Sequence, residues 1–346
     1  MVFIRPVNIS DLDQLEELAG LAGAGLTTLP KDRDLLSRRI AKSTRSFENL
    51  PDRPGGESYL FVMEDPDANR IVGACGIVSK VGGFQPFYAY KIETSLFESH
   101  VIKVRKEVPI LTLYEEHDGP CEIGSLFLHP VWRKENNGRM LQLVRFLFIA
   151  EHPEAFEPTV VSEIRGVLDE KGHSPFWNAL GQHFFDIDFT EADRLSIVNK
   201  RFIADLMPDH PIYIPLLPAD AQDVIGKPHP ESIPAVKNLS AEGFQFSGMV
   251  DIFDAGPVMN CPRDEIRTVR ESRRGRVVSI SDQPFEALVY MMGTTTGDFR
   301  SCKGPVQVKG DELVIPSDCA KVLKVRVGDS LRFVVLRAVQ NNPPAP

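Results

Sequence analysis

Cysteine is scarce in this sequence of 346 residues, which contains only Cys75, Cys121, Cys261, Cys302 and Cys319. The number is odd and no two of them stand in CxxC spacing, so the pattern indicates neither a disulfide framework nor a zinc site. We therefore expect reduced thiols and no metal centre. Cys75 and Cys121 stand in apolar, strand-like segments, where a thiol is expected to be chemically inert.

Long apolar runs are absent as well. No segment approaches the roughly 20 apolar residues that span a bilayer, and residues 1–6 lack a basic segment followed by an apolar stretch. We expect no membrane association and a cytoplasmic location.

Positive charge is in deficit, because 39 Lys and Arg residues face 48 Asp and Glu residues, a net charge of −9. Phosphate binding rests on accumulated positive charge, so this balance argues against a nucleic-acid partner. An acidic surface instead favours cationic substrates.

What is present is the composition of a folded globular protein, with 42% apolar and 25% charged residues. At about 150 residues per domain, the length predicts two or three folding units, or one large unit with an appendage.

Strand and helix patterns alternate along the first 190 residues. A short strand at 2–6 and two helices, the second ending near residue 43, precede a hairpin at 59–64 and 71–78, where turn residues separate two β-rich runs. Residues 44–58 are expected to be loop. The further predicted elements are strands near 87–93, 109–115, 121–128 and 158–164, helices at 138–150 and 174–180, and an extended run at 181–189. This order predicts an α/β fold with a mixed sheet and helices on its faces.

The pattern is looser from residue 190 onward. The predicted elements are helices at 191–206 and 232–241, a proline-rich loop at 207–230, an extended run at 244–259 and β-rich pieces between 284 and 338. We expect a domain over 1–262 with an insertion at about 190–240. A linker helix and a small β-rich C-terminal domain then occupy 263–346.

Residues 126–141 are the most informative stretch, because an apolar strand ends at a proline, passes through a basic turn and enters an apolar helix. A helix start leaves free N–H groups and a partial positive charge, which suit an anion. Gly138 allows close approach of a pyrophosphate, and Arg133, Lys134 and Arg139 add charge. An ordinary strand–turn–helix with basic side chains fits the same spacing.

Pro130, Arg133, Gly138 and Leu141 follow an apolar strand in a spacing that resembles the acyl-CoA site of the GNAT N-acyltransferase superfamily. Asn136 stands where the superfamily usually has its first glycine, and Asn tolerates a positive φ better than most residues. A closer resemblance, to the arginine N-succinyltransferase family, covers nearly the whole chain and weakens after about residue 280. The segments that carry it are 25–30, 125–134, 163–166, 174–177, 223–226, 229–230 and 251–257.

This resemblance implies a GNAT-like fold and transfer of succinyl from succinyl-CoA to the α-amino group of L-arginine, the first step of a succinyl-dependent arginine degradation route. Some family members also accept L-ornithine. Succinyl-CoA would be a co-substrate, with no permanently bound cofactor. The resemblance also implies a homo-oligomer, or a hetero-oligomer with a paralogous subunit.

A CoA site follows from the same resemblance. In the GNAT fold, the strand at Leu126, Phe127 and Leu128 splays from its neighbour, so its backbone groups are expected to bind the pantetheine arm and polarise the thioester. The residues expected to bind the pyrophosphate are Arg133, Lys134, Asn136, Asn137, Gly138 and Arg139.

The sequence alone cannot choose a catalytic residue among eight histidines. The resemblance points to His229, held between Pro228 and Pro230, as the general acid that protonates the CoA thiolate.

The residues expected to bind substrate are Thr27, Thr28, Glu122, Glu163 and Arg165. The two glutamates have open alternatives: guanidinium ligands, a base acting through water, or structural ion pairs such as Glu163 with Arg165. Asp251 and Asp254 are open between arginine recognition and a role in their own turn. Thr27, Thr28, Arg38 and Arg39 are the candidates for the succinyl carboxylate.

One basic stripe remains, at Arg263, Arg267, Arg270, Arg273, Arg274 and Arg276. We expect a solvated, ion-paired helix face, with the CoA 3′-phosphate or a partner subunit as alternative contacts. Two alternatives to the function stay open: a non-catalytic acyl-CoA or amino-acid sensor of the same fold, and an acyltransferase that acts on ornithine or another amine.

Overall fold

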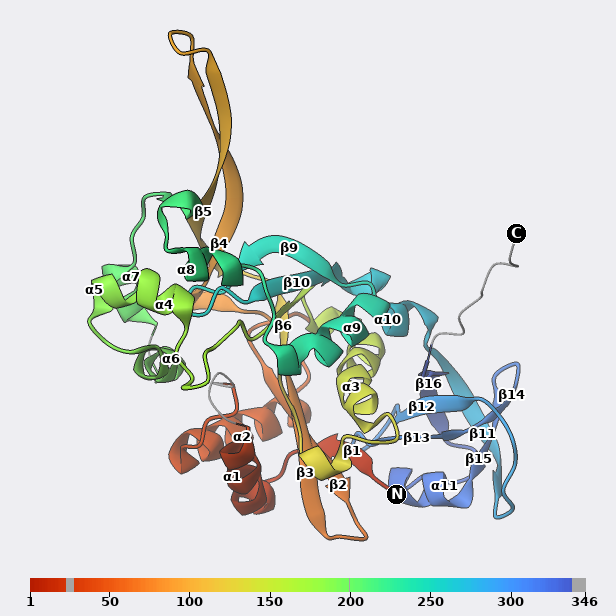
Figure 1. The fold of residues 1–346 in the computed structure, drawn as a ribbon. Coiled ribbons are helices and arrows are strands. Elements are labelled where there is room, and N and C mark those ends of the chain that lie inside the picture. The colour runs from red at the N-terminus through yellow and green to blue at the C-terminus, as the bar shows by residue number, and fades with distance from the viewer. Residues whose placement is uncertain (23–27, 199, 338–346) are drawn as a thin grey trace.

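The computed structural model describes residues 1–22, 28–198 and 200–337. A mixed sheet of sixteen strands runs through this part of the chain, with helices packed on its faces (Figure 1). The strand order is β14-β15-β11-β16-β12-β13-β1-β2-β3-β6-β7-β10-β9-β4-β5-β8. The α/β fold with a mixed sheet, which the sequence predicts, is confirmed.

The strands are β1 (Phe3–Pro6), β2 (Ser58–Asp65), β3 (Arg70–Val78), β4 (Gly82–Ser99), β5 (Val104–Asp118), β6 (Cys121–Leu128), β7 (Thr159–Glu163), β8 (Ile212–Tyr213), β9 (Gln245–Val250), β10 (Pro257–Pro262), β11 (Arg273–Ser281), β12 (Val289–Thr294), β13 (Ser301–Pro305), β14 (Gln307–Lys309), β15 (Glu312–Pro316) and β16 (Ser330–Val335). The helices are α1 (Leu12–Leu21), α2 (Arg33–Glu48), α3 (Asn137–Glu151), α4 (Pro175–Ala179), α5 (Gln182–Phe185), α6 (Phe189–Val198), α7 (Arg201–Leu206), α8 (Ala219–Val224), α9 (Ile233–Ala241), α10 (Arg267–Glu271) and α11 (Ser317–Leu323). Among the described residues, no helix is long and apolar enough to cross a membrane.

The centre of the sheet is buried on both faces, and β2 shows how the sequence achieves this. Successive residues of a strand point to opposite faces. Tyr59, Phe61 and Met63 join the core that contains α3, whereas Leu60 and Val62 join the core under α1 and α2. The hairpin of β2 and β3, predicted from its two β-rich runs, is confirmed and separates these two cores.

The extended run expected at 181–189 is wrong, because Gln182–Phe185 forms α5. A Cβ on Gly181 would lie 2.3 Å from Trp177, so only glycine lets this turn pack against the indole. Trp177 in turn packs on Phe185, with ring centroids 5.3 Å apart. Packing in this third core therefore overrides the local strand preference. The loop expected at 44–58 also begins late, because α2 continues to Glu48.

The single helix face expected for the basic stripe is also wrong. Arg267 and Arg270 lie on α10, whereas Arg273, Arg274 and Arg276 lie on β11. Strand β11 pairs with β16 on one side and β15 on the other, and both partners come from later in the chain. Long-range pairing thus decides the structure of a segment whose local spacing is helical.

Strands β4 and β5 form a long hairpin that projects from the body of the molecule (Figure 1). Its base is held between β9 and β8, and beyond Glu93 and Pro109 it continues as a two-stranded ribbon. Val101 and Ile102 at its tip are 92% and 69% exposed.

Strands β6 and β7 run parallel and separate after a short pairing. Their backbone pairing covers the Cys121–Val160 and Glu122–Val161 positions, and one side-chain bond follows, from Ser162 Oγ to the Ile123 carbonyl at 3.2 Å, although β6 continues to Leu128. The splay of the strand that holds residues 126–128, expected from the GNAT resemblance, is confirmed. It opens a gap in the middle of the sheet.

Candidate active site

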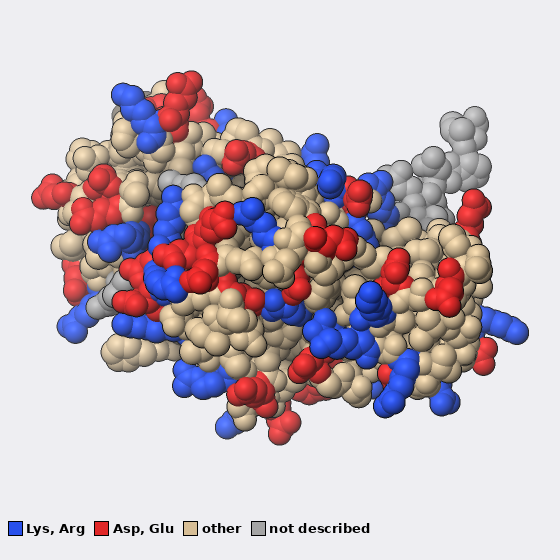
Figure 2. All heavy atoms as spheres, turned by 90° about the horizontal axis from the view of Figure 1, so that it is seen from below, with Lys and Arg blue, Asp and Glu red and all other residues tan. Residues whose placement is uncertain are grey.

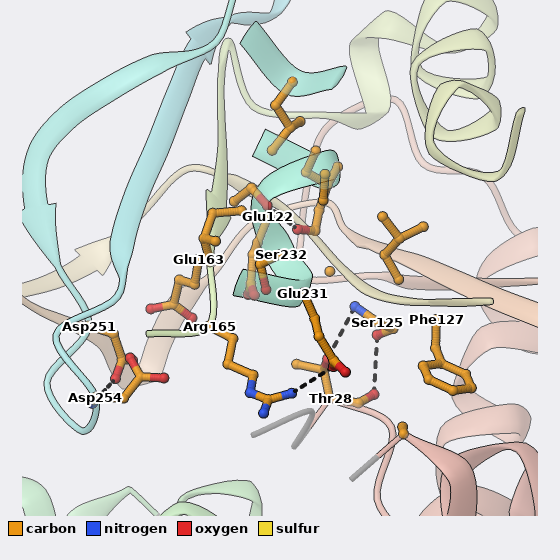
Figure 3. A pocket seen from close by; sticks show the side chains of 18 of the residues that line it. Thr28, Glu122, Ser125, Phe127, Glu163, Arg165, Glu231, Ser232, Asp251 and Asp254 are labelled. Atoms are coloured by element: carbon orange, nitrogen blue, oxygen red, sulfur yellow. Dashed lines mark hydrogen bonds and ion pairs between the residues drawn. The ribbon is translucent and has the colours of Figure 1, made fainter. Parts of the chain in front are cut away.

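A cavity of about 230 Å³ lies where β6 and β7 separate. Its walls come from both strands, from α3 and α9, and from the turn before β10. Figure 3 shows Glu163, Arg165, Asp251 and Asp254 on one side of this cavity and Thr28, Ser125 and Phe127 on the other. A second cavity of about 270 Å³ adjoins it, and the residues that line both are Thr28, Glu122, Glu163, Asp193, Asp251 and Phe253.

A β-bulge in β6 shapes one wall of the first cavity. Cys75 of β3 faces both Ser125 and Leu126, and Ser125 has a left-handed φ of 54°. Thr28 fixes this bulge from outside the sheet: its Oγ1 accepts a hydrogen bond from Ser125 N at 3.1 Å, and its carbonyl accepts one from Ser125 Oγ at 3.1 Å. Arg39 Nη2 donates to the same Oγ at 2.5 Å.

The start of α3 lies at the end of this strand and carries the turn that the sequence singles out. Asn136 adopts a φ of 62°, as its tolerance for positive φ allows, and α3 then runs for 15 residues from Asn137. A Cβ on Gly138 would have one contact, at 3.8 Å with Leu128. Arg133 is exposed and donates to Leu128 O at 3.1 Å, and Lys134 is exposed.

The C-terminal strands add positive charge at this helix start. Lys303 Nζ on β13 donates to Asn137 Oδ1 at 2.6 Å and to the Glu135 carbonyl. Arg337 donates to Asn136 Oδ1. More than 160 positions separate each of these cations from the turn, so no local sequence signal could identify them.

Arg139 has its partners inside the protein. It donates to the Leu336 carbonyl at 2.6 Å, to Asn238 Oδ1 at 3.3 Å and to Glu242 Oε1 at 3.1 Å. Glu242 is fully buried and also accepts from Arg267 at 2.9 Å. The structure therefore gives Arg139 a structural ion pair at the position where the sequence suggests a pyrophosphate ligand.

His229 stands at the start of the turn that leads into α9. Two residues in contact with it, Arg165 and Glu231, line the first cavity. Its Nδ1 accepts a hydrogen bond from Glu231 N at 3.2 Å, and Arg165 Nη2 lies 3.2 Å from its Nε2. Burial and the Arg165 charge lower the pKa of His229, and Glu231 partly offsets them. The imidazole is therefore neutral near pH 7.

The Glu163–Arg165 ion pair left open by the sequence is not present among the described residues. Arg165 instead lies 3.8 Å from Glu231 across the cavity, and its backbone carbonyl accepts from His229 N at 2.8 Å. Arg165 thus ties the end of β7 to the turn that carries the histidine.

Besides Glu231, five carboxylates gather around the two cavities: Glu122, Glu163, Asp193, Asp251 and Asp254. Figure 2, a view of the molecule from below, shows red Asp and Glu side chains gathered left of the middle of that face, beside blue Lys and Arg side chains. Burial, with the neighbouring charges of Glu122 and Asp251, raises the pKa of Glu163 well above its usual range. Burial and Asp251 likewise raise the pKa of Asp193 to about 8. The cluster therefore carries protons that a bound cation would displace.

Two of these carboxylates differ in what they hold. Asp254 accepts from Gly166 N at 2.7 Å and from Gly256 N at 2.8 Å, so both of its oxygens support the turn, one of the two roles that the sequence left open. Asp251 uses one oxygen for Phe253 N and Asp254 N, at 2.7 and 2.9 Å.

Thr28, Glu122, Glu163 and Arg165 are thus brought together as the sequence suggests, whereas Thr27 lies outside the described residues. Sequence reasoning missed Asp193, Lys200, Gln142 and Arg145, which also line the cavities. Among the described residues, no group of His, Cys, Asp and Glu has an arrangement suited to a metal ion.

Comparison with known proteins places this chain in a family. A family model described as arginine N-succinyltransferase beta subunit matches residues 2–268, and one described as its C-terminal domain matches residues 273–334. Arginine N-succinyltransferases of Yersinia pestis strain Pestoides F and Escherichia coli strain 55989 are 40% and 39% identical to this chain. Each comparison covers 98% of the chain and at least 98% of the relative.

A solved structure, of arginine/ornithine succinyltransferase subunit AI from Pseudomonas aeruginosa, has a TM-score of 0.89 and 33% identity. The match covers 98% of this chain and 99% of that chain. On these matches over almost the full length, the chain belongs to the arginine N-succinyltransferase family and is an acyltransferase.

Proposed function

We propose that this protein transfers the succinyl group of succinyl-CoA to the α-amino nitrogen of L-arginine. The observation that carries the proposal is the gap between β6 and β7. Its cavity extends toward the basic start of α3 on one side and toward five carboxylates on the other. An anionic donor and a cationic acceptor can therefore meet at one point of the sheet.

The donor would lie along β6. Because β7 no longer pairs with β6 beyond Glu122, the backbone around Leu126 and Phe127 would bind the pantetheine arm. The Ile123, Gly124 and Leu128 carbonyls and Ser125 N already have hydrogen-bond partners within the protein. The pyrophosphate would lie at the start of α3, where free N–H groups, Arg133 and Lys134 face an anion. Lys303 from β13 adds a third cation to this end.

The acceptor would lie against the acidic cluster. Carboxylates bind a guanidinium in bidentate geometry and also attract an ammonium group. Within the described residues, the side-chain oxygens of Glu122 and Glu163 accept no hydrogen bond. Asp251 uses only one of its two oxygens. These oxygens are available to a cationic amino acid.

His229 would move the proton. When the neutral amine attacks, a C–N bond forms, the C–S bond breaks, and the proton of the nitrogen must reach the CoA sulfur. In the neutral ring Nδ1 accepts from Glu231 N, so the ring hydrogen is on Nε2. The ring would take the proton of the nitrogen at Nδ1 once that contact opens, and give its Nε2 hydrogen to the thiolate as the general acid. The lowered pKa of His229 supports this role, because it keeps the ring unprotonated before each turnover.

CoA-thiol release tests this proposal. We expect release from succinyl-CoA that depends on L-arginine and is at least about 100-fold slower in His229→Ala, the usual size of a lost acid–base contribution. The control variant His100→Ala changes an exposed histidine at the tip of the hairpin. Binding of succinyl-CoA without release under any acceptor would instead favour the sensor.

An acceptor panel in the same assay separates the remaining alternative. L-ornithine and agmatine, which lacks the α-carboxylate, are compared with L-arginine at equal concentration. A larger kcat/KM for ornithine would assign the chain to that amine. The oligomeric assembly implied by the family resemblance stays a prediction, which sedimentation velocity of the purified chain tests.

A further inference from the structure

Arg145 is a buried cation beside the first cavity. It lies in the third turn of α3, and only 2% of its surface is exposed. Its side chain nevertheless lines the cavity, together with Gln142 one turn earlier on the same helix face. No step of the proposed reaction described above uses either residue.

Arg145 has no carboxylate partner within the described parts of the chain. Its Nε donates to the Gln142 carbonyl at 3.2 Å, and its Nη1 donates to the Gly124 carbonyl at 3.4 Å. The ionisable groups nearest to it are the thiols of Cys75 and Cys121. Burial raises the pKa of Cys75 to about 12 and that of Cys121 further, so both thiols are neutral.

Two other arginines of this region, the buried Arg267 and the partly buried Arg139, are different. Arg267 lies 2.9 Å and Arg139 lies 3.1 Å from Glu242, a carboxylate with no exposed surface. A buried charge without a counter-ion is strongly unfavourable, so an unpaired guanidinium at a cavity wall needs an anion from elsewhere. Gln142 adds a second unmet polar group, because its Oε1 is buried without a hydrogen-bond partner.

We propose that Arg145 binds the free carboxylate of the succinyl group and thereby selects a dicarboxylic acyl donor. This inference rests on the proposed function, because the acyl group must lie in the gap between β6 and β7. Arg145 contacts Gly124, which lies two residues beyond Glu122, the last residue of β6 that pairs with β7. A short acyl chain entering at the bulge of Ser125 has this guanidinium at its inner end.

Arg39, the alternative named from the sequence, lines the second cavity, whereas Arg145 lines the first. Glu122 stabilises its charge, and its Nη2 already donates to Ser125 Oγ at 2.5 Å. A succinyl carboxylate placed there would meet the repulsion of the acidic cluster. Arg145 has only neutral thiols and backbone carbonyls around it, so the anion is favoured on the α3 side.

Donor competition tests the proposal with succinyl-CoA and butyryl-CoA, whose four-carbon acyl groups differ in the terminal carboxylate. At saturating L-arginine, we expect Arg145→Met to lower the succinyl-to-butyryl ratio of kcat/KM by about 10- to 100-fold, as for loss of a charge-assisted hydrogen bond. Arg145→Lys should recover part of this ratio. Arg39→Gln tests the alternative site, because a loss of the ratio in this variant and not in Arg145→Met would assign the carboxylate to Arg39 and overturn the proposal. The control is Arg105→Gln, at an exposed arginine of the projecting hairpin, which should leave the ratio within about 3-fold of native.

An equal loss with both donors in Arg145→Met would assign the residue a structural role and overturn the proposal. Should that variant fail to fold, titration calorimetry of the native protein decides, since succinyl-CoA should bind at least about 10-fold more tightly than butyryl-CoA. Equal affinities would overturn the inference. A native protein that releases no CoA with arginine would contradict the proposed function, whereas tight and selective succinyl-CoA binding would still support the assignment of Arg145.

Discussion

The charge of His229 is decided by two neighbours that act in opposite directions. Arg165 places a positive charge 3.2 Å from Nε2, whereas the Glu231 carboxylate favours the protonated ring. Glu231 N also donates to Nδ1, so this nitrogen is occupied as an acceptor. Burial and Arg165 prevail, and the pKa of His229 lies below its ordinary value of 6.5.

These two neighbours allow a test with opposite expected signs. If the neutral imidazole begins each turnover, kcat/KM rises with pH through the pKa of His229, with a midpoint below 6.5. Arg165→Gln removes the repelling charge and should move this acidic limb to higher pH. Glu231→Gln removes the stabilising charge and should move it to lower pH, while its backbone N–H donor is retained.

The measurement is the pH profile of kcat/KM between about pH 5 and 8, the range in which a histidine titrates. Only the midpoint is compared, because either variant can lower the absolute rate. Midpoints that move together, or do not move, would contradict the assignment of this limb to His229.

Sequence reasoning at the residue scale succeeded where neighbours in the chain are neighbours in space. Asn136 was expected to tolerate a positive φ within one local turn, and it does adopt one. The binding of a pyrophosphate by Asn136 and Gly138 stays a prediction. Asp193, Arg145 and Lys303 were not identified, because a helix face or a distant strand brings each to the site. His229 came from family resemblance, since its surroundings include a contact with Arg165, 64 positions away.

At the scale of the element, the bulge of β6 determines where the sheet opens. Ser125 holds a left-handed φ that suits glycine and disfavours β-branched residues, and its hydroxyl joins Thr28 and Arg39 to the strand. The bulge places two residues opposite one on β3, which turns the strand away from β7.

Two substitutions separate the backbone role of Ser125 from its hydroxyl role. Ser125→Gly keeps the φ accessible and the backbone hydrogen bond to Thr28 Oγ1, and removes only the hydroxyl contacts with the Thr28 carbonyl and Arg39. We therefore expect reduced kcat with a small change in melting temperature. Ser125→Val adds strain of about 1–3 kcal/mol at this φ and should melt several degrees below Ser125→Gly. Differential scanning calorimetry measures the difference, and equal melting temperatures would show that the bulge carries no strain at this residue.

Elements with strong local patterns were predictable, and those formed by distant pairing were not. The β2–β3 hairpin and helix α3 follow from turn residues and apolar runs within one segment. The arginine spacing of residues 273–276 predicts a continued helix, but this segment forms β11 because the later strands β15 and β16 pair with it. The extent of the β4–β5 hairpin was underestimated, because its outer half is exposed and its apolar residues, such as Leu96, Phe97 and Val104, face no core.

At the scale of the whole molecule, the C-terminal strands extend the same sheet and reach the proposed donor site. Strand β13 pairs with β1 at Ser301 and Ile4, and this places Lys303 against the start of α3. Ion pairs of Glu151 with Arg274 and Arg332, at 2.7 and 2.6 Å, hold the same two parts together. The domain division at residue 262 remains a prediction.

Lys303 therefore links the C-terminal strands to donor binding. Lys303→Met removes a cation from the start of α3, and we expect KM for succinyl-CoA to rise about 3- to 10-fold while KM for L-arginine is unchanged. The matched control is Lys309→Met, a lysine on β14 at the far edge of the sheet. Initial-rate measurements with each substrate varied in turn give the two KM values. A rise in both would indicate a general loss of structure and contradict a specific role of Lys303 in donor binding.

The most direct test of the account is identification of the product formed from succinyl-CoA and L-arginine. Mass spectrometry should show one succinyl group added to arginine, and NMR should place it on the α-nitrogen, with one CoA released per product. This outcome requires an anionic donor and a cationic acceptor to meet where β6 and β7 separate. Release of free succinate without an arginine adduct, or an adduct on the guanidinium, would contradict the proposed arrangement of the site.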